Sequence, residues 1–233
     1  MPDSAACRIG MVLFPRLTQL DLTGPLEVLA RMPGAEVDLL WHRLEPVAAD
    51  RGLVLTPTAT FEAYGTPDIL FVPGGPGQLS AMEDAGLVGF VRRAGQAARL
   101  VTSVCTGALI LGAAGLLVGR RATTHWTVVD QLALLGAEPV RERVVVDGNV
   151  VTGAGVSAGI DFALTVAAQL HGESLAREIQ LQIEYDPQPP FDSGSVRTAA
   201  PELVERLIRA AAGLIERRRA VAERIGRTLE GTA

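Results

Sequence analysis

The stretch 99–110, RLVTSVCTGALI, constrains the fold of this chain more than any other. An apolar run rich in β-branched residues ends abruptly at Cys105, and a Thr-Gly pair then leads into small apolar residues. This pattern predicts a buried strand, a tight turn and a helix, with the cysteine at the turn as in a nucleophile elbow. A thiol in that position lies at the N-terminus of the next helix, where the helix dipole is expected to favour the thiolate.

Cys105 has a second interpretation, because a free cysteine is most often a small, buried apolar residue. Its place at a turn, rather than within the strand, favours the nucleophile. Cys7 is interpreted as an inert cysteine. Two cysteines do not form a disulfide framework, so we expect a reduced, cytoplasmic protein.

Strands alternate with helices along the chain, which is typical of a mostly parallel sheet with helices on both faces. Strands are expected near residues 8–14, 37–41, 68–72, 100–105, 144–147 and 150–152, with a hairpin between 46 and 59. Helices are expected near residues 25–31, 87–98, 106–117, 126–135, 159–170, 174–185 and 201–229, and Pro25 suits a first helical position. The sequence therefore predicts one α/β domain over residues 1–233, with 200–233 as a helical extension.

The expected C-terminal helix carries an apolar stripe. The stripe consists of Val204, Ile208, Ala211 and Ile215, roughly continued by Val221, Ile225 and Leu229. The opposite face is charged and includes the arginines 217–219. The helix either packs on its own domain with a solvated charged face or forms a dimer contact. Since packing must hold a helix of this length and two-fold pairing is the commonest oligomer, we expect a homodimer.

Four unusual segments follow the expected strands, namely Asp21, Gly74-Gly75, Cys105 and the glycine-rich residues 153–155. Ligands bind beyond the carboxyl ends of the strands in open parallel sheets. The convergence of these segments at one edge predicts an active site there.

Each candidate has a chemical and a structural interpretation. Asp21 is a general acid/base for the thiol or only a helix N-cap. Gly74 and Gly75 bind charge on the substrate through backbone N–H groups or simply form a tight turn. The Thr106 hydroxyl contacts the substrate or caps the next helix. His125 binds the substrate or, as is more common, is a structural histidine; His42 and His171 are expected at the surface.

Composition excludes several classes of protein. The formal net charge of −5 argues against a nucleic-acid partner. There is no lysine among the 21 basic residues, so Schiff-base and pyridoxal-phosphate chemistry are excluded. Three scattered histidines and two cysteines have no metal-ligand spacing, and we expect neither a metal nor another cofactor. Residues 1–4 and the rest of the chain predict neither a signal peptide nor a membrane span.

Several motifs together resemble the PfpI/ThiJ superfamily. They are Asp21-Leu22-Thr23-Gly24-Pro25, Pro73-Gly74-Gly75, Thr102-Ser103-Val104-Cys105-Thr106-Gly107, Ala122-Thr123-Thr124-His125-Trp126 and Gly159-Ile160-Asp161-Phe162-Ala163. The resemblance covers essentially the whole chain and implies a flavodoxin-like fold related to class I glutamine amidotransferases.

Within the superfamily, the chain looks most similar to the members that hydrate isocyanides, a likeness that extends to Arg120-Arg121 and Glu184-Tyr185. The resemblance implies cofactor-independent hydration of a small-molecule isocyanide to a formamide, with Cys105 as nucleophile and Asp21 as acid/base. Superfamily proteases place histidine directly after the cysteine, whereas this chain has Thr106, so peptidase activity is not expected. Ala154 stands where the hydrating relatives tend to have glycine.

Two other functions stay open from the sequence. The same motifs occur in sensor domains of transcription regulators, which add a C-terminal helix-turn-helix domain for which residues 201–233 are too short. A glyoxalase-like or redox-protective thiol protein is the other alternative.

Overall fold

The computed structural model describes residues 6–231. Residues 1–4, on which the expected lack of a signal peptide depends, lie outside the described residues, as does the end of the 200–233 extension. Within residues 6–231, no helix is both long and apolar enough to cross a membrane.

A seven-stranded sheet forms the centre of the fold, in the order β10-β11-β7-β6-β1-β2-β5. All neighbouring strands are parallel except β10, which pairs antiparallel with β11. The strands are β1 (Cys7–Val12), β2 (Ala35–Trp41), β5 (Ala59–Thr60), β6 (Ile69–Val72), β7 (Leu100–Val104), β10 (Val144–Asp147) and β11 (Val150–Gly153). Two short pairs lie outside this sheet: β3 (Val47–Ala48) with β4 (Val54–Leu55), which is the expected hairpin, and β8 (Arg121–Ala122) with β9 (Glu138–Pro139).

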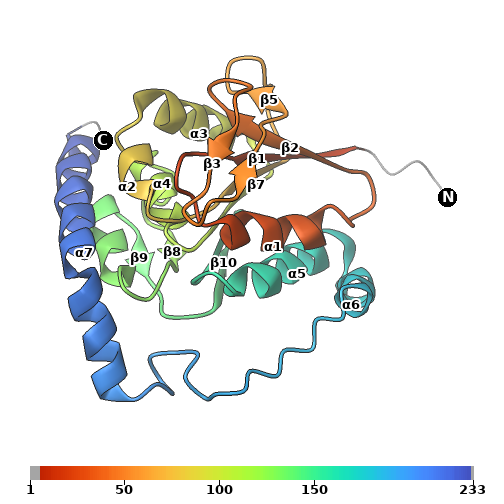
Figure 1. The fold of residues 1–233 in the computed structure, drawn as a ribbon. Helices are drawn as coiled ribbons and strands as arrows, with labels where there is room; N and C mark the ends of the chain where they lie inside the picture. Colours follow the sequence, from red (N-terminus) through yellow and green to blue (C-terminus); the bar gives the residue numbers. More distant parts are fainter. Residues whose placement is uncertain (1–5, 232–233) are drawn as a thin grey trace.

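Helices cover both faces of the sheet, as Figure 1 shows. The helices are α1 (Gln19–Leu29), α2 (Gln78–Ala81), α3 (Ala85–Ala97), α4 (Gly107–Ala113), the 3₁₀ helix η1 (Val129–Leu135), α5 (Ala158–His171), α6 (Glu173–Gln182) and α7 (Pro201–Glu230). Helices α1 and α5 pack together on one side, and α3 and α4 contact β6 on the other. The prediction of a mostly parallel sheet with helices on both faces is confirmed.

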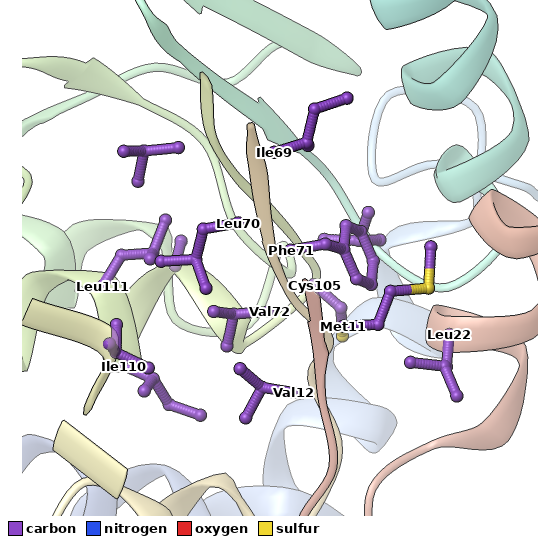
Figure 2. Packing of buried hydrophobic residues seen from close by; sticks show 14 of the residues in the cluster. Met11, Val12, Leu22, Ile69, Leu70, Phe71, Val72, Cys105, Ile110 and Leu111 are labelled. Carbon is purple, nitrogen blue, oxygen red and sulfur yellow. The ribbon is translucent and has the colours of Figure 1, made fainter. Parts of the chain in front are cut away.

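The central strand β6 is buried on both faces because its side chains alternate between the two helical layers. Phe71 points to the side of Leu22 in α1, and its ring lies 5.8 Å from that of Phe162 in α5. Leu70 points to the opposite side, toward Leu111 of α4 (Figure 2). A strand buried on both faces has a continuous apolar sequence, so this strand could be predicted from the sequence.

The structure corrects the start of α1. Pro25 was expected at the first helical position, but α1 begins at Gln19 and includes Pro25 in its interior. A proline there removes a hydrogen bond of the helix. Its ring lies against α5, since a side chain placed on Gly159 would come within 3.0 Å of Pro25. Close packing of α1 and α5 therefore compensates for the lost hydrogen bond. Because α1 begins at Gln19, Asp21 lies inside the helix.

Helix α7 buries only part of its apolar stripe. In its second half, Val221 and Ala222 are buried against the rest of the fold, and α7 packs on η1, α4 and α2. In its first half, Leu207 and Ile208 are 47% and 43% exposed. Figure 1 shows the start of this half extending beyond the other elements, so these two side chains are not covered within residues 6–231.

Candidate active site

Cys105 adopts the strained backbone of a nucleophile elbow. Its φ angle is +55°, a conformation that costs a residue with a Cβ about 1–2 kcal/mol. Hydrogen bonds hold the turn in place, because the Cys105 N–H donates to the carbonyls of Gly153 at 3.0 Å and Ala154 at 2.9 Å. The Thr124 hydroxyl donates to the Cys105 carbonyl at 2.6 Å. The predicted strand–turn–helix with a cysteine at the turn is confirmed.

Asp21 lies in the first turn of α1, at its third residue. The N-cap is Thr18, so the interpretation of Asp21 as a helix cap is wrong. The side chain is completely buried, and the Cys105 thiol and the Gly74 N–H both face it. Neither the thiol nor the N–H group is in good hydrogen-bond geometry with the carboxyl group. Both carboxyl oxygens of Asp21 therefore lack a hydrogen-bond partner among residues 6–231. A buried carboxyl in this state is a functional candidate rather than a structural one.

Burial raises the pKa of Asp21 to about 7, since an ionised carboxylate loses its hydration there. The Cys105 thiol and the Gly74 N–H oppose this rise. The charge of Asp50, which accepts a hydrogen bond from Thr18 at 3.3 Å, adds to the rise. Asp21 is therefore able to hold a proton near neutral pH, as a general acid must.

The expected lowering of the thiol pKa is wrong in its net direction. Burial, followed by the neighbouring Asp21 carboxylate, raises the pKa of Cys105. The backbone N–H groups of Thr106 and Val156 act in the expected, opposite direction. Because Cys105 is only 4% exposed, the loss of hydration outweighs the helix N-terminus.

The loop after β6 packs directly against the elbow. A side chain on Gly74 would lie 2.5 Å from the Thr106 nitrogen and 2.9 Å from the Asp21 carboxyl, so only glycine fits. Gly75 has a φ of +134°, and its N–H donates to the Thr106 hydroxyl at 3.0 Å. Both N–H groups thus face protein groups rather than open space. Thr106 is the N-cap of α4, yet its side chain bonds to Gly75 instead of capping the helix.

His125 lies against Gly155, next to the segment whose carbonyls accept hydrogen bonds from the Cys105 N–H. Its Nδ1 is 2.8 Å from the Thr127 hydroxyl, and burial, with a smaller effect of Arg218, lowers the pKa of His125 to about 4. The imidazole is therefore neutral at pH 7. His42 and His171 are exposed, as predicted.

A cavity of about 520 Å³ opens beside the elbow. Two of its lining residues touch Cys105, since Thr124 bonds to the Cys105 carbonyl and the Val156 N–H faces the thiol. His125, Trp126, Val129, Gly155 and Val156 line the inner wall, and residues 193–197 with Leu203, Val204 and Leu207 line the outer wall. No group of three or more His, Cys, Asp or Glu side chains within 6–231 is placed to hold a metal ion.

The DJ-1/PfpI family model matches residues 7–169 of this chain. The chain belongs to the DJ-1/PfpI family. An isonitrile hydratase from Pseudomonas putida is 52% identical over 219 residues, which cover 94% of this chain and 96% of that protein. A crystal structure of a ThiJ/PfpI family protein from Pseudomonas syringae is 43% identical, with a TM-score of 0.92 over 95% of this chain and 92% of that one. The resemblance to this superfamily and the flavodoxin-like fold are thereby confirmed.

A DJ-1/PfpI domain also occurs in a regulator. The HTH-type transcriptional regulator CdhR of Pseudomonas aeruginosa is 33% identical over 178 residues, which cover 73% of this chain but only 53% of the regulator. Nearly half of the regulator therefore has no counterpart in the matched part of this chain. The match to the hydratase, by contrast, extends over nearly all of both proteins.

One residue near the elbow lies outside the part of the chain that the DJ-1/PfpI model matches. Arg218 of α7 is only 6% exposed, and its Nη2 donates to the Gly75 carbonyl at 3.1 Å. The expectation that Arg218 lies with Arg217 and Arg219 on a solvated charged face is wrong. Its spacing from Ile215 and Ala222 places it on the buried stripe, a signal that was present in the sequence.

Proposed function

We propose that this chain is an isocyanide hydratase, which converts R–N≡C and water to the formamide R–NH–CHO. The observation that carries the proposal is the buried pair of Asp21 and Cys105 at a strained elbow. The similarity to the Pseudomonas putida isonitrile hydratase over nearly the whole chain supports the choice of substrate.

The reaction begins with one proton shared between Asp21 and Cys105. With the proton on Asp21, the Cys105 thiolate attacks the terminal carbon of the isocyanide and a C–S bond forms. Asp21 donates its proton to the same carbon, which yields the thioimidate R–N=CH–S. A carboxyl with a pKa of about 7 is suited to this donation at neutral pH.

Water then releases the product. The Asp21 carboxylate takes a proton from a water molecule while the water oxygen bonds to the thioimidate carbon. Asp21 then passes this proton to the substrate nitrogen, which gives the tetrahedral intermediate R–NH–CH(OH)–S. Asp21 takes the second proton from the oxygen as the C–S bond breaks. The formamide leaves, and the pair again holds one proton, so neither a metal nor a redox cofactor takes part in the proposed steps.

The neighbouring residues have supporting roles in this proposal. Thr106 and Gly75 hold the loop against the elbow through their mutual hydrogen bonds. The Gly74 N–H faces the Asp21 carboxyl and stabilises its charge after the proton is donated. His125 lines the cavity as a neutral side chain and contacts the substrate there.

The cavity beside Cys105 is proposed to hold the R group. Trp126, Val129 and Val156 give its inner wall apolar surface, and its volume exceeds that needed for a methyl group. We expect cyclohexyl isocyanide to be hydrated with a kcat/KM at least about tenfold above that of methyl isocyanide, because each buried methylene stabilises binding by about 0.8 kcal/mol. Loss of the isocyanide and appearance of the formamide, followed by NMR, measure both rates. If neither compound is hydrated, the proposed function is excluded.

We also propose that the protein is a homodimer. The first half of α7 extends beyond the other elements and leaves Leu207 and Ile208 exposed within the described chain. The same half-helix forms the outer wall of the cavity, where a second copy helps to exclude water. Light scattering is expected to give a mass near twice the chain's 24.5 kDa. Ile208→Glu should shift the mass toward that of the monomer, and Leu53→Glu, in a distant hairpin, should not; a wild-type mass near 24.5 kDa would refute the dimer.

Two further assignments belong to the proposal. The buried second half of α7 supports one domain over residues 1–233. Both cysteines are free thiols, which supports a reduced compartment and hence a cytoplasmic location.

A further inference from the structure

Arg218 is a buried cation whose charge has no obvious partner. The side chain is 6% exposed and forms no ion pair with a carboxylate within residues 6–231. Its Nε is buried without a hydrogen-bond partner among the same residues. Its neighbour Arg217 is exposed on the same helix. A buried, unpaired charge is costly to the fold, and such charges are concentrated at functional sites.

The guanidinium contacts the loop that holds the elbow. Its Nη2 donates to the Gly75 carbonyl, and the Thr106 hydroxyl donates to that same carbonyl at 3.3 Å. Thr106 directly follows Cys105, so two hydrogen-bonded residues, Gly75 and Thr106, connect Arg218 to the nucleophile. The charge of Arg218 interacts with Cys105 and with His125, which lines the cavity.

We propose that Arg218 is a positioning residue whose charge draws the negative charge of the Asp21–Cys105 pair onto the sulfur, so that the shared proton rests on Asp21. The inference rests on the Cys105 mechanism of the proposed function, but not on the identity of the substrate. It assigns to α7, which lies outside residues 7–169 of the DJ-1/PfpI match, a direct part in the reactivity of the thiol.

The charges around the pair all favour this direction. Asp50 lies on the side of Asp21 and repels a carboxylate there, whereas Arg218 attracts a thiolate. His125 is neutral at pH 7 and does not compete. Three arginines line the cavity: Arg141 and Arg143 are paired with Asp130 and Asp161, and Arg197 is exposed to solvent. Among residues 6–231, Arg218 is the one buried basic side chain, so its charge is the least screened by water.

The test separates the charge of Arg218 from its hydrogen bond. Arg218→Gln keeps a donor for the Gly75 carbonyl and loses the charge, and Arg218→Lys keeps the charge. Alkylation of Cys105 by iodoacetamide is measured against pH, with peptide mapping to separate it from Cys7. We expect the Gln variant to react about tenfold more slowly at pH 7, with the midpoint of its pH profile raised by about one unit, because a cation near a thiol lowers its pKa by about 1–3 units.

The Lys variant should recover most of the rate, and the control Arg217→Met should match the wild type. Equal alkylation of the Gln variant and the wild type would overturn the proposal. A Lys variant as slow as the Gln variant would also overturn it, because the hydrogen-bond geometry would then matter and not the charge. If Arg218→Gln does not fold by circular dichroism, Arg218→Met is compared with Arg218→Lys under the same criteria. Alkylation needs no isocyanide, so its result stays valid even if the protein hydrates no isocyanide.

Discussion

Cys105→Ala is expected to lower the kcat of isocyanide hydration by at least about 10⁴-fold, because no covalent intermediate can form without the nucleophile. The variant should fold normally, since alanine keeps the Cβ and loses only one small buried group. Cys105 is held by backbone hydrogen bonds to Gly153 and Ala154, which do not depend on its side chain. The measurement is steady-state formamide production together with circular dichroism.

Cys7→Ala is the matched control for this variant. Cys7 lies on β1, away from the elbow, and burial raises its pKa, so its removal should leave turnover unchanged. Formamide production by a folded Cys105→Ala protein would contradict the proposed mechanism. Trapping of a mass adduct on the peptide that contains Cys105, during turnover of the wild type, would support the thioimidate.

Asp21→Asn is expected to slow turnover by about 10²–10⁴-fold, the usual contribution of a general acid–base group. Asparagine has nearly the same shape but cannot share a proton with the Cys105 thiol. Asp50→Asn is the comparison variant: it removes the carboxylate that adds the smallest contribution to the raised pKa of Asp21 and leaves Asp21 in place, so it should slow turnover far less than Asp21→Asn. An Asp21→Asn enzyme of full activity would exclude Asp21 from the reaction.

The same pair predicts a pH profile. Below about pH 7, Asp21 and Cys105 both hold a proton, and no thiolate forms. As the pH rises through about 7, the pair loses one proton and reaches the reactive state, so kcat/KM should rise through that pH. The apparent pKa belongs to the pair and not to one residue. The rise near pH 7 should be absent from Asp21→Asn.

Asp21→Asn should also stabilise the fold at pH 8. The folded-state pKa of about 7 lies above the ordinary 3.8, so the contribution of Asp21 to stability is fully present below about pH 4 and is lost as the pH rises through about 7, where Asp21 ionises within the fold. The difference between these two values corresponds to about 4 kcal/mol, an upper limit for the gain in the free energy of unfolding above pH 7. Urea unfolding of both proteins at pH 8 and pH 4 measures it. The gain should disappear near pH 4, and a loss of stability at pH 8 would contradict this account.

The sequence alone determined the parts of this protein that depend on local patterns. Apolar runs such as 69–72 specify strands buried on both faces, and alternation with helices specifies a parallel sheet. In such a sheet, the ends of β1, β6, β7 and β11 meet at one edge, which is why Asp21, Gly74 and Cys105 were predicted together. The elbow was also predictable, since a cysteine between a strand and a helix has few other conformations.

The tertiary structure alone decided the electrostatics of the site. Whether the Cys105 thiol ionises depends on how completely it is buried and on the charges beside it, and neither quantity is local in sequence. The helix N-terminus favoured the thiolate, but burial and the Asp21 carboxyl outweighed it. Arg218 and Asp50 reach the elbow from segments far from it in the chain, through the packing of α7 and of the β3–β4 hairpin. Because desolvation and Coulomb interactions depend on distances in space, only the folded structure brings these charges to the cysteine.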